Sequence, residues 1–264
     1  MGNLQDCSIN IKPETTYKTG VTPDRAFRFT SETLDWNPTI VQGEGLKVGT
    51  YMDLADERVV PSGQGGGDIN FQVGSKGFGY LWQACLGTAT STVVLTSTYQ
   101  QVHTWAKQPS SLTIQKTSVE AGGTVDPVTF KGCSVTQWQL TFANQGLVTL
   151  QVSVDAGDYD TVTGFAALSY PSTPNLFHFA NWTNITGVVT PATTTALATA
   201  STGTALAGVR SLTITGNRNP VVDRFNAIGT GRKDQPIGQQ FDVTGSLEIE
   251  YQNTTQRDAY LAQT

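Results

Sequence analysis

The chain of 264 residues carries a formal net charge of −5 at pH 7, with 38% hydrophobic and only 14% charged residues. This length and composition suit one large all-β domain or two small ones, and they argue against a helical enzyme or a disordered chain. The acidic balance and the lack of a basic run argue against a protein that grips nucleic acid or an anionic membrane. No stretch reaches the roughly 18 apolar residues of a membrane span or shows a leader pattern, so we expect a chain that stays in the cytosol.

The first part of the chain predicts an arm, a strand and a long connection. Residues 1–25 are polar and rich in turn residues, so we expect an extended arm outside the core, followed by a single β domain over residues 26–264. The stretch "AFRFTSETL" predicts a strand that buries Phe27 and Phe29. The connection from Val41 to Gly67 is too long for a structureless loop in a compact domain, and its alternating pieces indicate a protruding hairpin.

A short helix is predicted in "SKGFGYLWQACLG", after a strand in "GGDINFQVG". Phe78, Leu81, Trp82 and Cys85 recur at helical spacing, and Gly87 suits the C-cap. We expect this helix to cover one opening of the core.

The three cysteines are odd in number and widely spaced, which indicates neither a disulfide framework nor a metal site. We expect Cys85 and Cys133 to be core residues.

Four strands are predicted in the middle of the chain, in "TYQQVHTWAK", "SSLTIQKTSV", "SVTQWQLTF" and "GLVTLQVSVDAGD". In the last two, aromatic and aliphatic residues share one face. The opposite faces are neutral or acidic and consist of Gln137, Gln139, Thr141, Thr149, Gln151, Ser153 and Asp155.

The C-terminal part predicts two strands and a last helix. Residues 186–207 lack aromatic and charged residues, which is typical either of a flexible surface excursion or of strands packed against a neighbour. The stretch "FDVTGSLEIEY" alternates almost without fault, so we expect a half-buried strand with one face against a core, while the opposite face, with Glu248 and Glu250, is polar and negative.

A faint internal repeat relates the two ends of the chain. "GDINFQV" aligns with "GSLEIEY", apolar on apolar, and each follows a Pro-x-Gly-Gln and precedes a predicted helix. Residues 26–87 and 208–264 could therefore be a duplication, although alternating strands resemble one another by construction.

The sequence offers little catalytic chemistry. The only two histidines, His103 and His178, lie in strand-like runs and are expected to be structural, and no metal-ligand spacing is present. Glu248 and Glu250 point the same way along one strand and do not make an acid and base pair. We therefore predict no catalytic residue, no metal and no cofactor, and a protein that is not an enzyme.

Several motifs in order resemble those of the major tail tube proteins of long-tailed, non-contractile bacteriophages. The resemblance rests on "GFGYLWQACLG", "TYQQVHTWAKQPSSLTIQK", "FKGCSVTQWQLTF" and "LVTLQVSVDAGD", and covers residues 25–160 best. It implies a β-sandwich or barrel with one or two short flanking helices and a long protruding loop. It also implies homo-hexameric rings stacked into a tube, in the virion tail, after assembly in the host bacterial cytoplasm.

The resemblance implies that the polar strand faces without cations line the lumen of the tube, because a lumen must let DNA pass without binding it. The expected lumen-facing residues are Asp68, Asn70, Gln72, Asp242, Thr244, Ser246, Glu248 and Glu250. The expected contacts between subunits or rings are Val41, Leu46, Val48, Tyr51, Met52, Leu54, Val59 and Val60. Implied partners are further copies of the chain, the tape measure, tail tip and terminator proteins, and DNA that passes without specific binding; no membrane is implied.

Other interpretations stay open at this point. The alternating faces could simply be solvated, and a true duplication would allow a ring of three doubled units in place of six. A carbohydrate-binding or adhesin-like β-sandwich would use Trp36, Trp105 or Trp182 as exposed stacking platforms, whereas a tube subunit would hide its aromatic residues. A jelly-roll hydrolase is disfavoured by the sparse histidines and the lack of paired acids.

Overall fold

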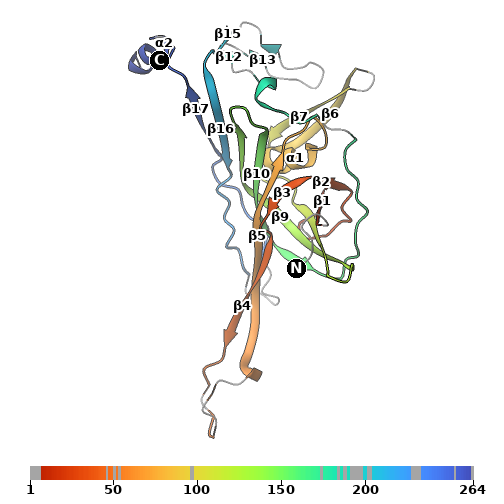
Figure 1. The fold of residues 1–264 in the computed structure, drawn as a ribbon. Helices are drawn as coiled ribbons and strands as arrows, with labels where there is room; N and C mark the ends of the chain where they lie inside the picture. Colours follow the sequence, from red (N-terminus) through yellow and green to blue (C-terminus); the bar gives the residue numbers. More distant parts are fainter. Residues whose placement is uncertain are drawn as a thin grey trace.

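A computed structural model describes residues 7–45, 47–49, 52, 55–95, 98–172, 175–182, 185–186, 189–190, 199–200, 204–226, 233–252 and 254–262. The described chain is built mainly of β-strands, as predicted (Figure 1). Most of these strands form two sheets around one hydrophobic core, and the long strand β9 (Val125–Phe142) belongs to both sheets.

Sheet 1 uses the first half of β9 and sheet 2 uses the second half. Sheet 1 runs in the order β2 (Arg25–Phe27), β1 (Ser8–Pro13), β8 (Leu112–Val119), β9 and β11 (Asp158–Asp160). Sheet 2 runs in the order β17 (Asp242–Ile249), β16 (Val209–Asn217), β9, β10 (Val148–Ala156) and β5 (Arg58–Gln72), beyond which lie β3 (Phe29–Glu32) and β4 (Asp35–Gln42). All these neighbours pair antiparallel.

Two irregularities mark the passage of β9 from one sheet to the other. Gly132 has φ +63°, and the pairing with β10 skips Thr136, because Val135 faces Val154 while Gln137 faces Ser153. An extra residue of this kind bends a strand and increases its twist. The bend lets both halves of β9 face the same core.

The prediction of an N-terminal arm is wrong for residues 8–13. These residues form β1 in the interior of sheet 1, with Ile9 and Ile11 fully buried in the core. The other face of β1 is buried too, because Asn10 Nδ2 donates to the carbonyl of Ala166, in a segment that crosses this sheet. The short polar residues that suggested exposure are therefore internal hydrogen-bonding groups.

The predicted helix is present as α1 (Gly79–Leu86), with Leu81, Ala84 and Cys85 buried. Trp82 packs edge-on against Trp138 of β9 at 6.1 Å between ring centroids. Gly87 ends the helix with φ +138°, and a Cβ there would lie 2.3 Å from the carbonyl oxygen of Thr104. The β-hairpin of β6 (Gly87–Leu95) and β7 (Thr98–Trp105) follows directly.

The long connection forms a hairpin that leaves the body at one end of the molecule (Figure 1). Strands β4 and β5 carry it, and a 3-10 turn (Ala55–Glu57) precedes β5. At its base the indole of Trp36 lies over Gly63 and Gly65, where an added Cβ would come within 2.6 Å of the ring, and stacks on Tyr159 at 4.8 Å. Gly63 and Gly65 thus make room for an aromatic ring.

The segment rich in threonine and alanine contributes two short strand pairs among its described residues. Strand β12 (Ile185–Thr186) pairs with β15 (Thr204–Ala205), and β13 (Val189–Thr190) pairs with β14 (Thr199–Ala200). A 3-10 turn (Phe179–Asn181) precedes them, and the last helix, α2 (Thr255–Ala262), lies at the end of the molecule away from the β4–β5 hairpin (Figure 1).

The expectation that one face of β17 rests against a core is wrong for this chain alone. Val243, Leu247 and Tyr251 are 53%, 41% and 68% exposed. Strand β17 is the edge of sheet 2, and the elements that cover the apolar side of β9, β10 and β5 do not cover it. The alternation is real, but the covering partner of its apolar side is not supplied by the described residues.

The proposed duplication stays a prediction. Its two matched strands occupy different places, since β5 lies inside sheet 2 and β17 lies at its edge.

Candidate functional site

One side of sheet 2 is a continuous polar surface. Cross-strand pairing aligns its residues in rows, one of which runs through Thr244, Thr215, Gln139, Gln151 and Asn70. Because side chains alternate along a strand, every second residue of each strand lies on this side. The polar face comprises Asp68, Asn70, Gln72, Gln137, Gln139, Thr141, Thr149, Gln151, Ser153, Ser211, Thr213, Thr215, Asn217, Asp242, Thr244, Ser246 and Glu248.

The acids of the polar face are held by neighbouring neutral side chains. Asp68 accepts hydrogen bonds from Gln151 Nε2 at 3.1 Å and Ser153 Oγ at 2.5 Å. Asp242 accepts one from Asn219 Nδ2 at 2.8 Å, and Glu248 accepts one from Ser211 Oγ at 2.9 Å. The hydrogen-bond partners of these three carboxylates are therefore neutral side chains, and no cation pairs with them among the described residues.

No Lys or Arg belongs to the rows of the polar face, and cations occur only at its margins. Arg210 is the extra residue in the irregular pairing of β16 with β17, and its guanidinium pairs with Glu250 at 3.2 Å. Lys233 is almost fully buried, where its ammonium pairs with Asp155. The central surface is thus acidic or neutral throughout.

The structure brings the residues predicted for a lumen onto one surface. Asp68, Asn70 and Gln72 lie near one edge of the polar face, and Asp242, Thr244, Ser246 and Glu248 lie at the other, with β16, β9 and β10 between them. Glu250 follows β17 and pairs with Arg210. Sequence reasoning missed the β16 residues Ser211, Thr213, Thr215 and Asn217, although the alternation of "SLTITGN" carries the signal.

The residues predicted to contact other subunits are exposed where they are described. Val41, Val48, Met52, Val59 and Val60 all lie on the β4–β5 hairpin or its tip and are largely open to solvent. Leu46, Tyr51 and Leu54 lie outside the described residues. An exposed aliphatic group of this kind on an extended hairpin is typical of a contact surface.

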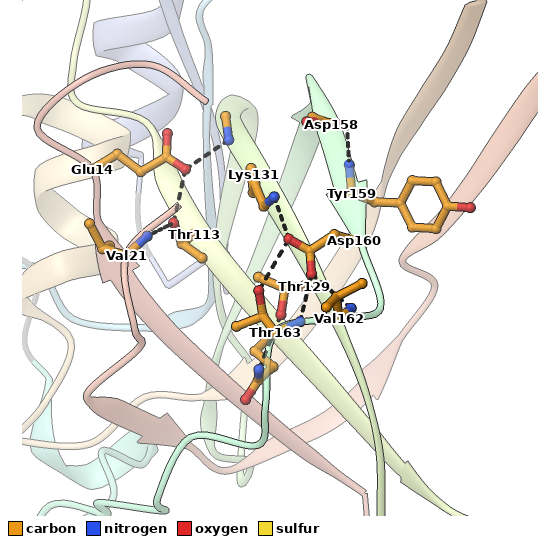
Figure 2. A network of polar contacts seen from close by, with 12 residues as sticks. Glu14, Val21, Thr113, Thr129, Lys131, Asp158, Tyr159, Asp160, Val162 and Thr163 are labelled. Atoms are coloured by element: carbon orange, nitrogen blue, oxygen red, sulfur yellow. Dashed lines mark hydrogen bonds and ion pairs between the residues drawn. The ribbon is translucent and has the colours of Figure 1, made fainter. Parts of the chain in front are cut away.

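Beneath the polar face, buried charges fasten the N-terminal segment and a C-terminal loop to sheet 1. Glu14 is buried and accepts a hydrogen bond from Thr113 Oγ1 at 2.9 Å (Figure 2). It also accepts hydrogen bonds from Ser111 Oγ at 2.5 Å and from the amides of Gly132 and Lys18. Nearby, Lys18 Nζ donates a hydrogen bond to the carbonyl of Lys233, a residue of the C-terminal loop, at 2.5 Å. These contacts hold the segments in place and present no open site.

Figure 2 also shows Asp160 at the centre of a second polar cluster. It pairs with Lys131 and accepts hydrogen bonds from the amide and hydroxyl of Thr163 at 2.8 and 3.1 Å. Burial alone would raise the pKa of Asp160, but these bonds outweigh it and lower the pKa to about 2. Asp155 of β10 has a different environment, because it is buried against Lys233.

The thiols and imidazoles do not form a reactive centre in the described part of the chain. Burial raises the pKa of the Cys85 thiol to about 12 and also raises that of Cys133, so both are core residues as predicted. Burial lowers the pKa of His103 in β7, while His178 Nδ1 accepts a bond from the amide of Ala180. No group of three metal-ligating side chains occurs among the described residues.

The tryptophans that could serve as sugar platforms each pack against another ring. Trp36 stacks on Tyr159. The ring centroids of half-buried Trp182 and Phe142 are 5.3 Å apart. Trp105 is 58% exposed, and its ring centroid lies 4.2 Å from that of Phe241. This arrangement offers no observation in favour of a carbohydrate-binding module.

No helix in the described parts of the chain is both long and apolar enough to span a membrane.

Comparisons with known proteins assign the family. A search among curated proteins found no match. The sequence matches the family described as phage tail tube protein over residues 5–264. The chain therefore belongs to the phage tail tube protein family and is a structural component of a phage tail.

Proposed function

We propose that copies of this chain close into rings, six to a ring, and that the rings stack into the tail tube of a long-tailed, non-contractile phage. The polar face of sheet 2 lines the lumen, and DNA leaves the virion through it. The single observation that carries this proposal is the polar face itself, which crosses β17, β16, β9, β10 and β5 without a Lys or Arg in its rows.

Cations in the wall of a tube would slow the DNA that moves through it. Duplex DNA carries one negative charge per roughly 1.7 Å of axis, and Lys and Arg bind it by neutralising phosphates. Each such contact along a tube would hold the DNA as it moves. A surface of amides and hydroxyls with the acids Asp68, Asp242 and Glu248 keeps the DNA away from the wall.

The other uncovered surfaces support assembly. An isolated chain leaves the apolar side of β17 and the aliphatic hairpin residues in water, which is unfavourable and favours association. We infer that neighbours in the ring cover β17 and that the β4–β5 hairpin reaches the adjacent ring. Six copies follow from the resemblance, and a ring of three doubled units stays the alternative.

The proposal places the chain among the other tail proteins. The tube would assemble in the host cytoplasm around the tape measure protein, start at the tail tip and end at the terminator. The role is mechanical, so it needs no catalytic residue, metal or cofactor.

Electron microscopy of the purified chain tests this proposal. We expect rings or tubes with a central hole as the protein concentration rises, and their symmetry decides between six and three copies. A chain that stays monomeric at every concentration, even when tail tips are added as nuclei, would contradict the proposal.

A further inference from the structure

Within the described chain, unpaired charges of opposite sign lie at the two edges of sheet 2, beside acids of the β3–β4 edge such as Glu32, which pairs with Lys116, and exposed Asp35. Strand β17 forms one edge and presents Asp242 and Glu248, both exposed. Each accepts a hydrogen bond from a neutral side chain, and neither has a cation as partner within the described chain. This edge is therefore an acidic strand with an uncovered apolar side.

The opposite edge carries cations. Arg28 directly precedes β3 and is exposed, and together with Lys76 it lines a small pocket of about 90 Å³ beside the start of that strand. Phe27, Phe78 and Leu176 form much of the pocket's apolar wall. In the part of the chain that the structure describes, no acidic side chain pairs with either cation, although Lys76 Nζ donates to the carbonyl of Ser172 at 3.4 Å.

The strand directions allow the two edges to join. From β17 through β16, β9, β10 and β5 to β3, every neighbouring pair is antiparallel, so β3 runs antiparallel to β17. A β17 strand next to the β3 strand of another copy would continue the antiparallel order. The polar face would continue across the junction, because the side-chain alternation is kept.

The positions of Arg28 and Glu248 along their strands are also compatible with contact between the two edges. Phe29 shares a row with Gly245, through Phe71, Leu150, Leu140 and Ile214, so Arg28 stands level with Ser246. Glu248 is two residues further along β17, roughly 7 Å away. Closing a sheet into a barrel requires a stagger between its edges, and the long Arg side chain spans part of this offset.

We propose that a second copy of the chain occupies this edge, with Glu248 of one copy against Arg28 and Lys76 of the next, and Leu247 of the first copy in the small pocket. Adjacent residues of β17 point to opposite sides, so Leu247 faces the apolar wall while Glu248 faces the cations. Such a head-to-tail contact repeats until a ring closes. The charge match fixes which edge meets which and places a carboxylate beside the cations nearest the polar face.

The inference rests on the proposed ring and is tested by exchanging the charges. The variants are R28E, E248R and the double variant. The controls K107E and E120R make the same charge changes at exposed residues that belong to neither edge strand. The measurement is the protein concentration at which half of the chain sediments as rings or tubes. Thermal unfolding by circular dichroism checks that each variant folds.

We expect each single reversal to raise this concentration about tenfold or more, and the double variant to return within about threefold of the wild type. The controls should assemble like the wild type. High salt should reduce the effect of the single reversals, because exposed charges are screened.

Single variants that assemble like the wild type, or a double variant as poor as its parents, would overturn this junction while leaving the tube intact. A wild-type chain that forms no ring would overturn the proposed function as well, so the two failures are distinguishable.

Discussion

Glu14 shows how single buried residues hold the N-terminal segment in the fold. Its carboxylate is buried and accepts four hydrogen bonds, from Lys18, from Ser111 and Thr113 at the start of β8, and from Gly132. Replacing it by Ala leaves those donors without acceptors, which costs about 1–3 kcal/mol for each group that water cannot reach. We expect E14A to lower the free energy of unfolding by about 3 kcal/mol in urea denaturation, and E120A, at an exposed acid, to change it by less than about 0.5 kcal/mol. An E14A protein as stable as the wild type would contradict this role.

Asp160 gives a pH dependence at the residue scale. Its pKa of about 2 in the folded chain lies below the value of about 3.9 for an unfolded Asp, so the folded state binds its proton less readily. The stability that Asp160 contributes is therefore complete above about pH 4 and is lost as the pH falls toward 2.

We expect D160N to be less stable than the wild type by about 1 kcal/mol at pH 7, and the difference to shrink between pH 4 and pH 2. Urea unfolding at a series of pH values measures it. D126N, at an exposed acid, is the control. A difference that stays constant down to pH 2 would show that Asp160 is not the titrating group.

At the scale of elements, the β4–β5 hairpin is expected to serve assembly and not folding. Val59 and Val60 are exposed, so Ser at both positions should leave thermal unfolding of the monomer unchanged. Burying them between rings would stabilise the contact by about 2 kcal/mol or more, so V59S with V60S should raise the concentration for tube formation about thirtyfold. V125S, at an exposed Val outside the hairpin, should have no effect. Tubes at wild-type concentration from the double variant would argue against this role.

The comparison of sequence with structure is also clearest at this scale. The period-two patterns of β9 and β10 predicted their polar and apolar sides, since one side of each rests on the core. Strand β1 was not predicted because both of its sides are buried. Its polar residues form hydrogen bonds with residues more than a hundred positions away, such as Thr117 in β8 and Ala166. The apolar side of β17 could not be placed because what covers it lies outside the single chain.

For the whole molecule, the polar face should be sensitive to added cations. Gln139 and Thr215 face each other across β9 and β16 in the middle of the face, away from both edges. We expect Q139K with T215K to fold and to form tubes, but to slow DNA ejection, because each ring then presents Lys side chains that bind passing phosphates. Q139E with T215E is the matched control and should eject DNA at the normal rate. Ejection measured on phage that carry each variant decides the point, and an unchanged rate for the Lys variant would contradict the assignment of this face.

The most direct test of the central claim is a cryo-electron microscopy reconstruction of the assembled tube, at a resolution that shows side chains. We predict that the row of Thr244, Thr215, Gln139, Gln151 and Asn70 points toward the tube axis in every subunit. A tube in which this row lies on the outer surface or against a neighbouring subunit, with another face lining the channel, would contradict the account.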